Sequence, residues 1–441
     1  MAMLVRLFCA FLLAIWSGPT LASPDESAQL GSALSRSGGE ELRQFYMRHG
    51  NALAWSGERG KSNAAVALGI LANAGSDGLD PERYRVYQGS GDPAADDVAL
   101  STAVLAYMRD LAVGRQELQA VDADVALPPR AFNAPELLDE ALRSNRLADM
   151  LAALAPTGRE YAALKSELLH NPAGSSASVL MANMERWRWM PRMLEPDRIV
   201  INAADASLQL WLAGRPVLNS RVIVGKPATP TPILRAEGAG LTINPSWTVP
   251  KSIAVKEILP KLKRNPAYLA SQDMILLNGP PDDPHGLHVN WRAVRAGTFP
   301  YQIRQVPGAK NPLGQIKLEL PNRFDVYLHD TPGKTAFARP MRALSHGCVR
   351  VEQILPLASF ALKADLSAQE EIRLAIGTGE TRYLPLRKRL PVYFLYWTAF
   401  PDTEGHIQYR PDIYGRDQRL IAEMSGRVQR LSGDIPACPK G

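Results

Sequence analysis

The sequence predicts an α+β protein of several domains, with a helical first half and a β-rich second half. At 441 residues the chain is too long for one compact core. Between Glu40 and Leu169 apolar residues recur at helical spacing, whereas after Leu180 short β-branched runs alternate with turn-forming residues. We therefore expect two kinds of unit joined in one chain.

Residues 1–22 have the features of a secretory signal sequence. Arg6 supplies the positive end, Leu7–Trp16 the apolar run and Thr20–Ala22 a small-residue cleavage site. The run is short for a bilayer span and no second long one follows, so we expect export without a stable membrane anchor. An uncleaved N-terminal anchor is the alternative.

Three helices are expected in the first half. One runs from Ser101, which would cap it, to Gly114, which would end it. A second starts at Pro135, and a third begins near Leu147 and ends before Pro156. No reactive group of residues accompanies them, so we interpret this half as a helical scaffold.

The composition of residues 171–178 is typical of a linker. The aromatic and basic segment after it contains Trp187 and Trp189, which either stack on sugar rings or, as we expect, anchor the packing of a new domain. Strands are expected at Ile199–Asn202, Ser207–Leu212 and Val217–Val224, the last two joined as a hairpin through Ala213–Arg215.

An irregular insertion follows the first strands. A short amphipathic helix is expected at Ser252–Lys263, and loops continue to about Phe299, a length typical of a functional lid. His285 and His288 lie in it, but a metal site needs further ligands and no tight cluster accompanies them. We therefore expect a solvent-facing loop.

The remaining elements are strands at Ile316–Leu320, Phe324–Leu328 and Val392–Trp397, a helix at Val351–Leu362, and a short helix and polar tail from about Gln418.

Charge is distributed unevenly along the chain. Residues 23–180 hold 14 basic and 21 acidic side chains, whereas residues 181–441 hold 35 basic and 23 acidic ones. A basic half attracts anionic polymers, such as cell-wall or membrane-surface material or nucleic acid, although an ordinary solvated basic surface is an equal alternative.

Cys348 is the candidate nucleophile. Cys9 lies in the expected signal sequence, which leaves Cys348 and Cys438. A chain with so few cysteines is not a disulfide scaffold. A disulfide between Cys348 and Cys438 is the alternative. A thiol attacks as the thiolate and needs a base or a positive charge nearby. The alternative is a purely structural role as a buried core cysteine, but the residues beside Cys348 are more polar than those of a core strand.

Two histidines are candidates for the base. In the strand expected before it, His329 shares a face with Tyr327, so the imidazole can take the thiol proton while the phenol donates to substrate or oxyanion. Gly347 permits a sharp bend that aims N–H groups at a carbonyl oxygen. His346 adjoins the bend, and we expect it to orient the loop.

The spacing of these residues resembles a known signature. His329, fifteen intervening residues, and then Ser345–Cys348 are similar to the motif of the L,D-transpeptidases, peptidoglycan cross-linking enzymes with a cysteine nucleophile. The resemblance to the large Gram-negative branch with a helical scaffold is strong over residues 181–417 and weaker over 40–170. It includes Asn183–Trp189, Val224–Lys226, Asn244–Pro250, Arg304–Gly308, Tyr327–Pro332, Asp77–Pro81 and Asp110–Arg115.

The resemblance implies a β-rich sandwich in which Cys348 is the nucleophile and His329 the base. Cys348 would attack the third residue of a peptidoglycan stem peptide, release the terminal D-alanine, and pass the acyl group to another stem as a 3→3 cross-link. The resemblance implies no metal and no cofactor. It also implies that carbapenems acylate the Cys348 sulfur. The remaining site residues would be Tyr327, Ser345, His346 and Gly347 for the oxyanion and orientation, and Arg350, Trp247 and Asp330 for substrate binding.

Domain boundaries follow from composition and resemblance together. A peptidoglycan-binding module that the large branch often inserts is absent, so wall targeting would depend on the basic half, the scaffold or other cell-wall synthesis proteins. We expect a periplasmic protein with no nucleic-acid partner. The expected parts are a signal sequence (1–22), a scaffold domain (23–170), a linker (171–180), a catalytic domain (181–417) with a capping subdomain (251–299), and a C-terminal helix and tail (418–441).

Two other functions remain open at this stage. The same thiol would act as an L,D-carboxypeptidase or hydrolase on stem peptides or protein–wall linkages if water reached the thioester before an amine. A non-catalytic wall-binding scaffold is the other alternative, which the intact His329 and Cys348 disfavour.

Overall fold

The protein forms two compact units in a computed structural model that describes residues 24–37, 39–86, 89–115, 119–120, 122–363 and 365–425. The first unit holds the described residues up to Arg115 together with Arg130–Gly158, and the second holds Gln116–Pro129 and the chain from Arg159 onward. The expected signal sequence, Cys9 and Cys438 lie outside the described residues. No helix within the described ranges is both long and apolar enough to span a membrane.

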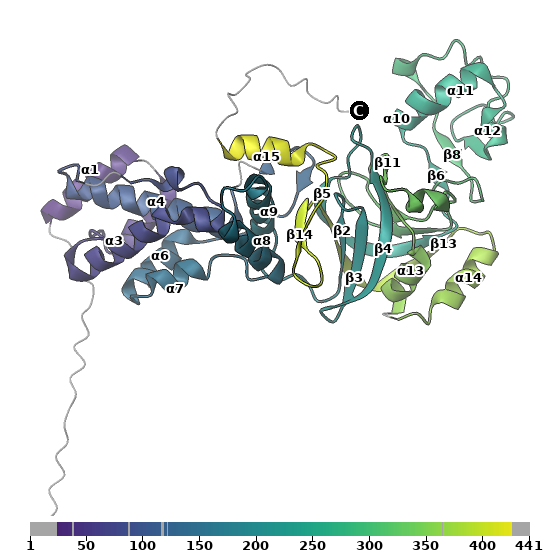
Figure 1. The fold of residues 1–441 in the computed structure, drawn as a ribbon. Helices are drawn as coiled ribbons and strands as arrows, with labels where there is room; N and C mark the ends of the chain where they lie inside the picture. Colours follow the sequence, from purple (N-terminus) through teal and green to yellow (C-terminus); the bar gives the residue numbers. More distant parts are fainter. Residues whose placement is uncertain are drawn as a thin grey trace, which may run out of the picture. The chain divides into compact units, whose positions relative to one another are not determined.

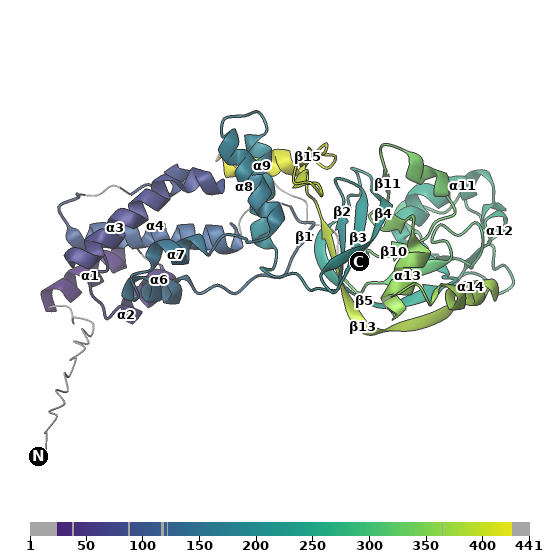
Figure 2. The same ribbon diagram turned by 60° about the horizontal axis from the view of Figure 1, so that its bottom comes forward.

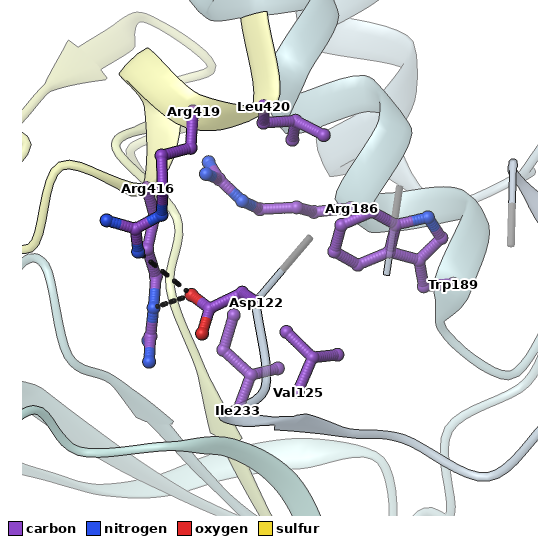
Figure 3. A pocket seen from close by; sticks show the side chains of 8 residues that line it. All are labelled: Asp122, Val125, Arg186, Trp189, Ile233, Arg416, Arg419 and Leu420. Atoms are coloured by element: carbon purple, nitrogen blue, oxygen red, sulfur yellow. Dashed lines mark hydrogen bonds and ion pairs between the residues drawn. The ribbon is translucent and has the colours of Figure 1, made fainter. Parts of the chain in front are cut away.

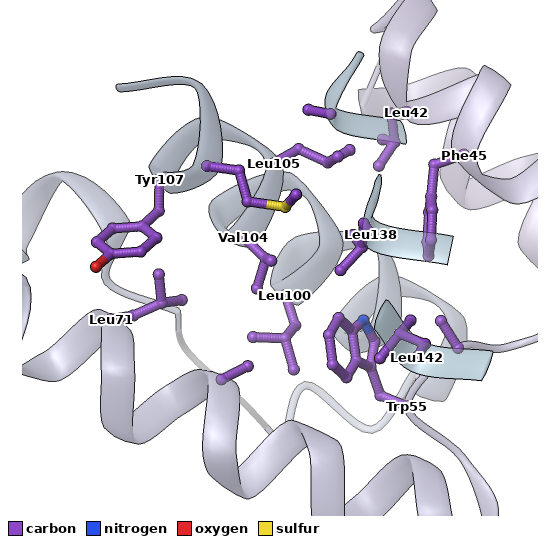
Figure 4. Packing of buried hydrophobic residues seen from close by; sticks show 14 of the residues in the cluster. Leu42, Phe45, Trp55, Leu71, Leu100, Val104, Leu105, Tyr107, Leu138 and Leu142 are labelled. Carbon is purple, nitrogen blue, oxygen red and sulfur yellow. The ribbon is translucent and has the colours of Figure 1, made fainter. Parts of the chain in front are cut away.

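The first unit is helical, as expected. Its core joins aromatic and aliphatic side chains from several helices, among them Phe45, Leu100 and Leu138, each fully buried (Figure 4). The helices are α1 (Pro24–Ser37), α2 (Glu40–Arg48), α3 (Gly57–Ala72), α4 (Pro93–Val113), α6 (Ala134–Arg143) and α7 (Leu147–Ala152) (Figure 1 and Figure 2).

Helix α4 starts earlier than expected. Asp92 caps it by accepting hydrogen bonds from the second and third N–H groups of the helix, and Pro93 occupies the first helical position. Ser101, the expected cap, is instead buried mid-helix, where its hydroxyl bonds Tyr46 and the Trp55 indole. The expectation was wrong because the helical stripe continues N-terminally through small residues.

The second unit is built on a ten-stranded sheet. Its strands are β1 (Val125–Ala126), β2 (Arg198–Asn202), β3 (Ser207–Leu212), β4 (Arg215–Gly225), β5 (Ile233–Ile243), β9 (Ile316–Glu319), β10 (Leu328–His329), β11 (Ala343–Ser345), β12 (Val349–Val351) and β13 (Arg382–Leu395). They follow the order β1-β5-β13-β2-β3-β4-β12-β10-β9, and β11 pairs with β4. Because β9 also pairs with β5, the sheet closes into a barrel-like form, more closed than the sandwich we expected.

Local expectations for this unit are mostly confirmed. The hairpin between β3 and β4 turns through Ala213 and Gly214, which both have positive φ, as a two-residue hairpin turn requires. Helix α13 (Ile354–Lys363) is also present, and α14 (Gln369–Gly377) was not expected.

Two helices between β1 and β2 pack with this unit. They are α8 (Arg159–His170) and α9 (Ala177–Trp189) (Figure 2). Trp187 stacks on Trp397 at 4.4 Å between ring centroids and is 8% exposed, so the packing interpretation of the tryptophan pair is confirmed. Helix α8 packs on α9 because the buried Arg188 of α9 donates to Tyr161 as well as to Glu185.

The insertion has its own small core. A nearly continuous helix runs through α10 (Lys251–Ile253), one π turn (Ala254–Ile258) and α11 (Leu259–Arg264), and α12 (Tyr268–Ser271) follows. A three-stranded sheet of β6 (Trp247–Thr248), β8 (Ile303–Gln305) and β7 (Met274–Leu276) closes it. Trp291 is 2% exposed in its core. The capping subdomain is therefore a folded body rather than a loop.

The remaining elements close the second unit. They are the short antiparallel pair β14 (Ala399–Pro401) and β15 (Ile407–Tyr409), and the helix α15 (Arg416–Met424), which packs on α9 (Figure 1).

Candidate active site

Two short parallel strands place the candidate site. Leu328 of β10 is paired with Val349 of β12, and both side chains are fully buried in the barrel core. Side chains alternate along a strand, so the next pair, His329 and Arg350, faces the opposite side. Cys348 immediately precedes β12 and lies on that same side, together with His329 in the lining of one cleft.

Tyr327 and His329 share a face, as the alternation predicted. Their rings lie 5.6 Å apart in an edge-to-face arrangement. The regular strand is shorter than expected and begins at Leu328, because Asp325 adopts a φ of 52° in a turn organised by Asn322. That turn brings the Asp325 carbonyl to 3.6 Å from Cys348 Sγ, which donates to it.

The thiol and the imidazole are both electrically neutral at rest. Burial raises the pKa of the Cys348 thiol, an effect that the backbone and phenol of Tyr327 oppose by stabilising the thiolate. Burial, together with the positive charge of Arg350, lowers the pKa of His329 to about 3. The imidazole is thus a free base at physiological pH, and its Nδ1 has no hydrogen-bond partner among the described residues.

These shifts predict a simple pH dependence for Cys348. His329 stays neutral between pH 5 and 8, so the thiolate fraction should grow about tenfold per pH unit as the thiol ionises. The rate of Cys348 alkylation by iodoacetamide, measured by peptide mass spectrometry, should rise in the same way without an inflection near 6.5. A plateau above about pH 6.5 would instead indicate a thiolate–imidazolium pair.

The turn before Cys348 is held by Ser345. The Ser345 hydroxyl donates to the Cys348 carbonyl at 2.5 Å and accepts the Gly347 N–H at 3.1 Å. Gly347 has a φ of 114°, which residues with a side chain rarely adopt. The bend at Gly347 is therefore confirmed, but its N–H is used within the turn. Of the expected oxyanion donors, the Tyr327 phenol is the one beside the thiol.

A second loop, residues 225–231, wraps around this turn, and we call it the cradle loop. The Ser345 carbonyl accepts the Lys226 N–H at 2.9 Å and the Thr229 hydroxyl at 3.2 Å. The Gly347 carbonyl accepts the Thr231 hydroxyl at 2.8 Å. Sequence reasoning missed these contacts, and no short-range signal marks them, because they join positions more than 100 residues apart.

His346 connects the turn to the capping subdomain. Its Nε2 lies 2.5 Å from a Glu257 carboxylate oxygen in the π turn and 3.2 Å from Lys226 Nζ. The imidazole is partly exposed and its nitrogen is engaged away from the thiol. This placement agrees with an orienting role for His346.

The cleft above Cys348 has a volume of about 730 Å³. His329, Arg350 and Tyr327 line it from the barrel, and Trp247 lines it from the capping subdomain. The Arg350 Nε is buried and has no hydrogen-bond partner among the described residues, so it is available to an acceptor on a ligand. The structure thus brings Arg350 and Trp247 to the site.

Asp330 does not line this cleft. It is 7% exposed, accepts the Gln315 N–H at 3.0 Å and pairs with Lys334 in a separate pocket. Gly314 approaches it so closely that a Cβ there would lie 2.5 Å from the carboxyl carbon of Asp330. Asp330 follows β10 with its side chain on the other face, and its expected substrate-binding role stays a prediction.

Lys317 was missed by sequence reasoning. It is paired with His329 across β9 and β10, and its Nζ lies 4.2 Å from the Tyr327 ring centroid and 2.7 Å from Glu319. Its charge lowers the pKa of the Cys348 thiol, although less than the Tyr327 contacts do. Register is decided by tertiary pairing, so no local pattern identified this lysine.

The histidines of the capping subdomain lie elsewhere in the structure. His285 Nδ1 is 2.8 Å from the Met274 carbonyl, and the His288 side chain projects into solvent beside Asp283. Within the described residues, no three His, Cys, Asp or Glu side chains gather in a metal-binding arrangement.

Comparison with known families matches both units. The model of the Scaffold domain matches residues 40–168, and the model of the L,D-transpeptidase catalytic domain matches residues 196–377, which include His329 and Cys348. Residues 196–377 thus form an L,D-transpeptidase catalytic domain. The expected resemblance and the α+β multidomain class are thereby confirmed, and the Scaffold match identifies the helical unit as the N-terminal domain of this branch.

The chain is also similar to individual proteins. A Haemophilus influenzae protein named "Putative L,D-transpeptidase" is 31% identical over 290 residues, which span 65% of this chain and 58% of that protein. Among solved structures, the Ldtfm–avibactam carbamoyl enzyme is 13% identical over 47% of this chain and 51% of its own, with a TM-score of 0.22. An L,D-transpeptidase from Mycobacterium smegmatis is 12% identical over 45% and 58%, also with a TM-score of 0.22. Scores this low carry no argument about this chain.

Proposed function

We propose that this L,D-transpeptidase-family protein forms 3→3 cross-links between peptidoglycan stem peptides through a thioester on Cys348. The observation that carries the proposal is the placement of Cys348, His329 and Tyr327 on one face at the base of the cleft. A nucleophile, a free base and a hydrogen-bond donor converge there, as acyl transfer requires.

The first half-reaction forms the acyl-enzyme. As Cys348 Sγ attacks the carbonyl carbon of the third stem residue, His329 accepts the thiol proton and the Tyr327 phenol donates to the developing oxyanion. The C–N bond to the terminal D-alanine then breaks, and the imidazolium returns the proton to the departing amine. Because a buried imidazolium beside Arg350 is disfavoured, His329 releases that proton readily.

The second half-reaction passes the acyl group to an amine. The side-chain amine of another stem attacks the thioester carbon, loses its proton to His329, and expels the Cys348 thiolate, which is reprotonated. Arg350 supports the donor by binding a carboxylate through its unpaired Nε, and Trp247 packs against the stem. The capping subdomain, joined to the site through Glu257, excludes water from the thioester.

The proposal includes location and partners. Export through the signal sequence predicted in residues 1–22 places the enzyme in the periplasm, where its substrate and other cell-wall synthesis proteins are found. Carboxylates on stem peptides fit the basic character of residues 181–441.

Product analysis tests the proposal. Purified protein incubated with tetrapeptide muropeptides should yield 3→3 dimers, identified by tandem mass spectrometry, together with free D-alanine. Tripeptide monomer as the sole product would overturn transfer in favour of hydrolysis by the same thiol. If neither product forms and Cys348 is not acylated, the non-catalytic alternative is favoured.

A further inference from the structure

Thr231 connects the turn before the nucleophile to the rest of the barrel. Its side chain is fully buried, and its hydroxyl donates to the Gly347 carbonyl at 2.8 Å while accepting the Gly225 N–H at 2.9 Å. One hydroxyl thus ties the end of β4 to the residue that precedes Cys348. Gly225 permits this closeness, since a Cβ there would lie 2.2 Å from the Thr229 carbonyl oxygen.

Arg416 in turn fixes the backbone of Thr231. Its Nη1 donates to the Thr231 carbonyl at 3.1 Å, and the residue is 4% exposed. Its Nε donates to Asp122 at 2.7 Å, and Arg419 reaches the same carboxylate at 3.2 Å (Figure 3). Charge-assisted bonds of this kind are stronger than bonds between neutral groups.

Asp122 belongs to a short segment that enters the second unit between two stretches of the scaffold chain. This strap, the described part of residues 119–129, adds β1 beside β5, and the Asp124 carbonyl accepts the Ile233 N–H at 2.9 Å. A continuous set of contacts therefore runs from the strap through Arg416 and Thr231 to the turn that carries Cys348.

We propose that Thr231 is a positioning residue that holds Cys348 Sγ in line for attack, and that Asp122 acts on the same turn through Arg416. The inference rests on the proposed role of Cys348 as nucleophile. Gly347 has a positive φ and the conformational freedom of a residue without a side chain, so loss of the Thr231 hydroxyl frees its carbonyl and lets the residue before Cys348 shift. A displacement of about 1 Å at a reacting atom costs on the order of 100-fold in rate.

A matched pair of substitutions tests the role of the hydroxyl. Thr231→Val keeps the shape and removes the hydroxyl, whereas Thr231→Ser keeps it. We expect Val to lower kcat for dimer formation by roughly 10- to 100-fold with KM nearly unchanged, and Ser to restore kcat to within about threefold of wild type. Thr403→Val, at an exposed turn position, is the control for the chemical change itself.

Alkylation of Cys348 by iodoacetamide gives a readout independent of substrate. A displaced Sγ loses the Tyr327 contact that stabilises the thiolate, so Thr231→Val should slow alkylation at a given pH by about tenfold and Thr231→Ser should not. If the Val and Ser variants differ in alkylation rate in this way but the wild type forms no dimer, the positioning role of Thr231 is supported and the proposed transpeptidase function is wrong. Equal kcat and alkylation rates in Val, Ser and wild type would overturn the positioning role.

Asp122→Asn tests the connection to the strap by itself, and it still serves if Thr231→Val fails to fold. A double-substitution cycle then tests whether both residues act through one turn. Asp122→Asn keeps the size of the side chain but removes its charge, and should lower kcat by about three- to tenfold while KM is kept. Combined with Thr231→Val, it should add less than about twofold, because both act through one turn. Multiplicative losses in the double variant, or an unchanged kcat in Asp122→Asn alone, would overturn the connection.

Discussion

Replacing Cys348 by alanine is expected to abolish both the acyl-enzyme and the cross-linked product, a loss on the order of 10⁴-fold or more. No other described cysteine shares the second unit, so no thiol described there can take its place. The measurement is the intact mass of the protein after incubation with a tetrapeptide donor, which should increase by the tripeptide moiety in wild type alone.

The Cys348→Ala variant should keep its thermal unfolding midpoint, because Cys348 lies at the cleft and not among the buried apolar core. Cys348→Ser is the matched variant, since it keeps a hydroxyl of similar size whose far higher pKa makes it a poor nucleophile. Dimer formation by Cys348→Ala at more than about 1% of the wild-type rate would contradict the covalent mechanism.

The two histidines are expected to differ sharply. His329→Ala should slow acylation of Cys348 by roughly 10²- to 10⁴-fold, because it removes the group that accepts the thiol proton. His346→Ala should slow it by less than about tenfold, since its Nε2 contacts Glu257 and Lys226 rather than the thiol. The measurement is the single-turnover rate of acyl-enzyme formation at saturating donor.

His329→Gln separates loss of the base from loss of buried volume. It fills much of the space left by the fully buried imidazole and cannot accept a proton, so its rate should match that of His329→Ala. Comparable losses in His329→Ala and His346→Ala would remove the assignment of the base. Recovery in His329→Gln would show that packing, not proton transfer, explains the effect.

Local pattern was enough to select the candidate catalytic residues. The two-residue alternation in Tyr327–His329 and the glycine beside Cys348 are short-range features, and the structure reproduces both. The helical stripe of the first unit and the hairpin at Ala213 and Gly214 were predicted on the same basis. Such features depend on residues within about one turn or one strand pair, which a sequence displays directly.

Local pattern did not show which partners the side chains of Asp330 and Ser101 have. Asp330 follows the candidate base in sequence, yet it points to the other face and holds Gln315 and Lys334. Ser101 is a residue type that often caps helices, but its hydroxyl instead forms buried hydrogen bonds with Tyr46 and Trp55. For Ser101, partners distant in sequence outcompeted the local capping role.

The sequence by itself determined the candidate groups of the site and the order of the units: a thiol at Cys348, an imidazole at His329 on the same face as a phenol, and a helical unit before a β-rich one. Only the tertiary structure decided how that thiol is held. The Thr231 bond to Gly347 spans 116 residues and the Arg416 bond to Asp122 spans 294. Contacts of such separation follow from the closure of the barrel and the return of the strap, which no periodicity along the chain records.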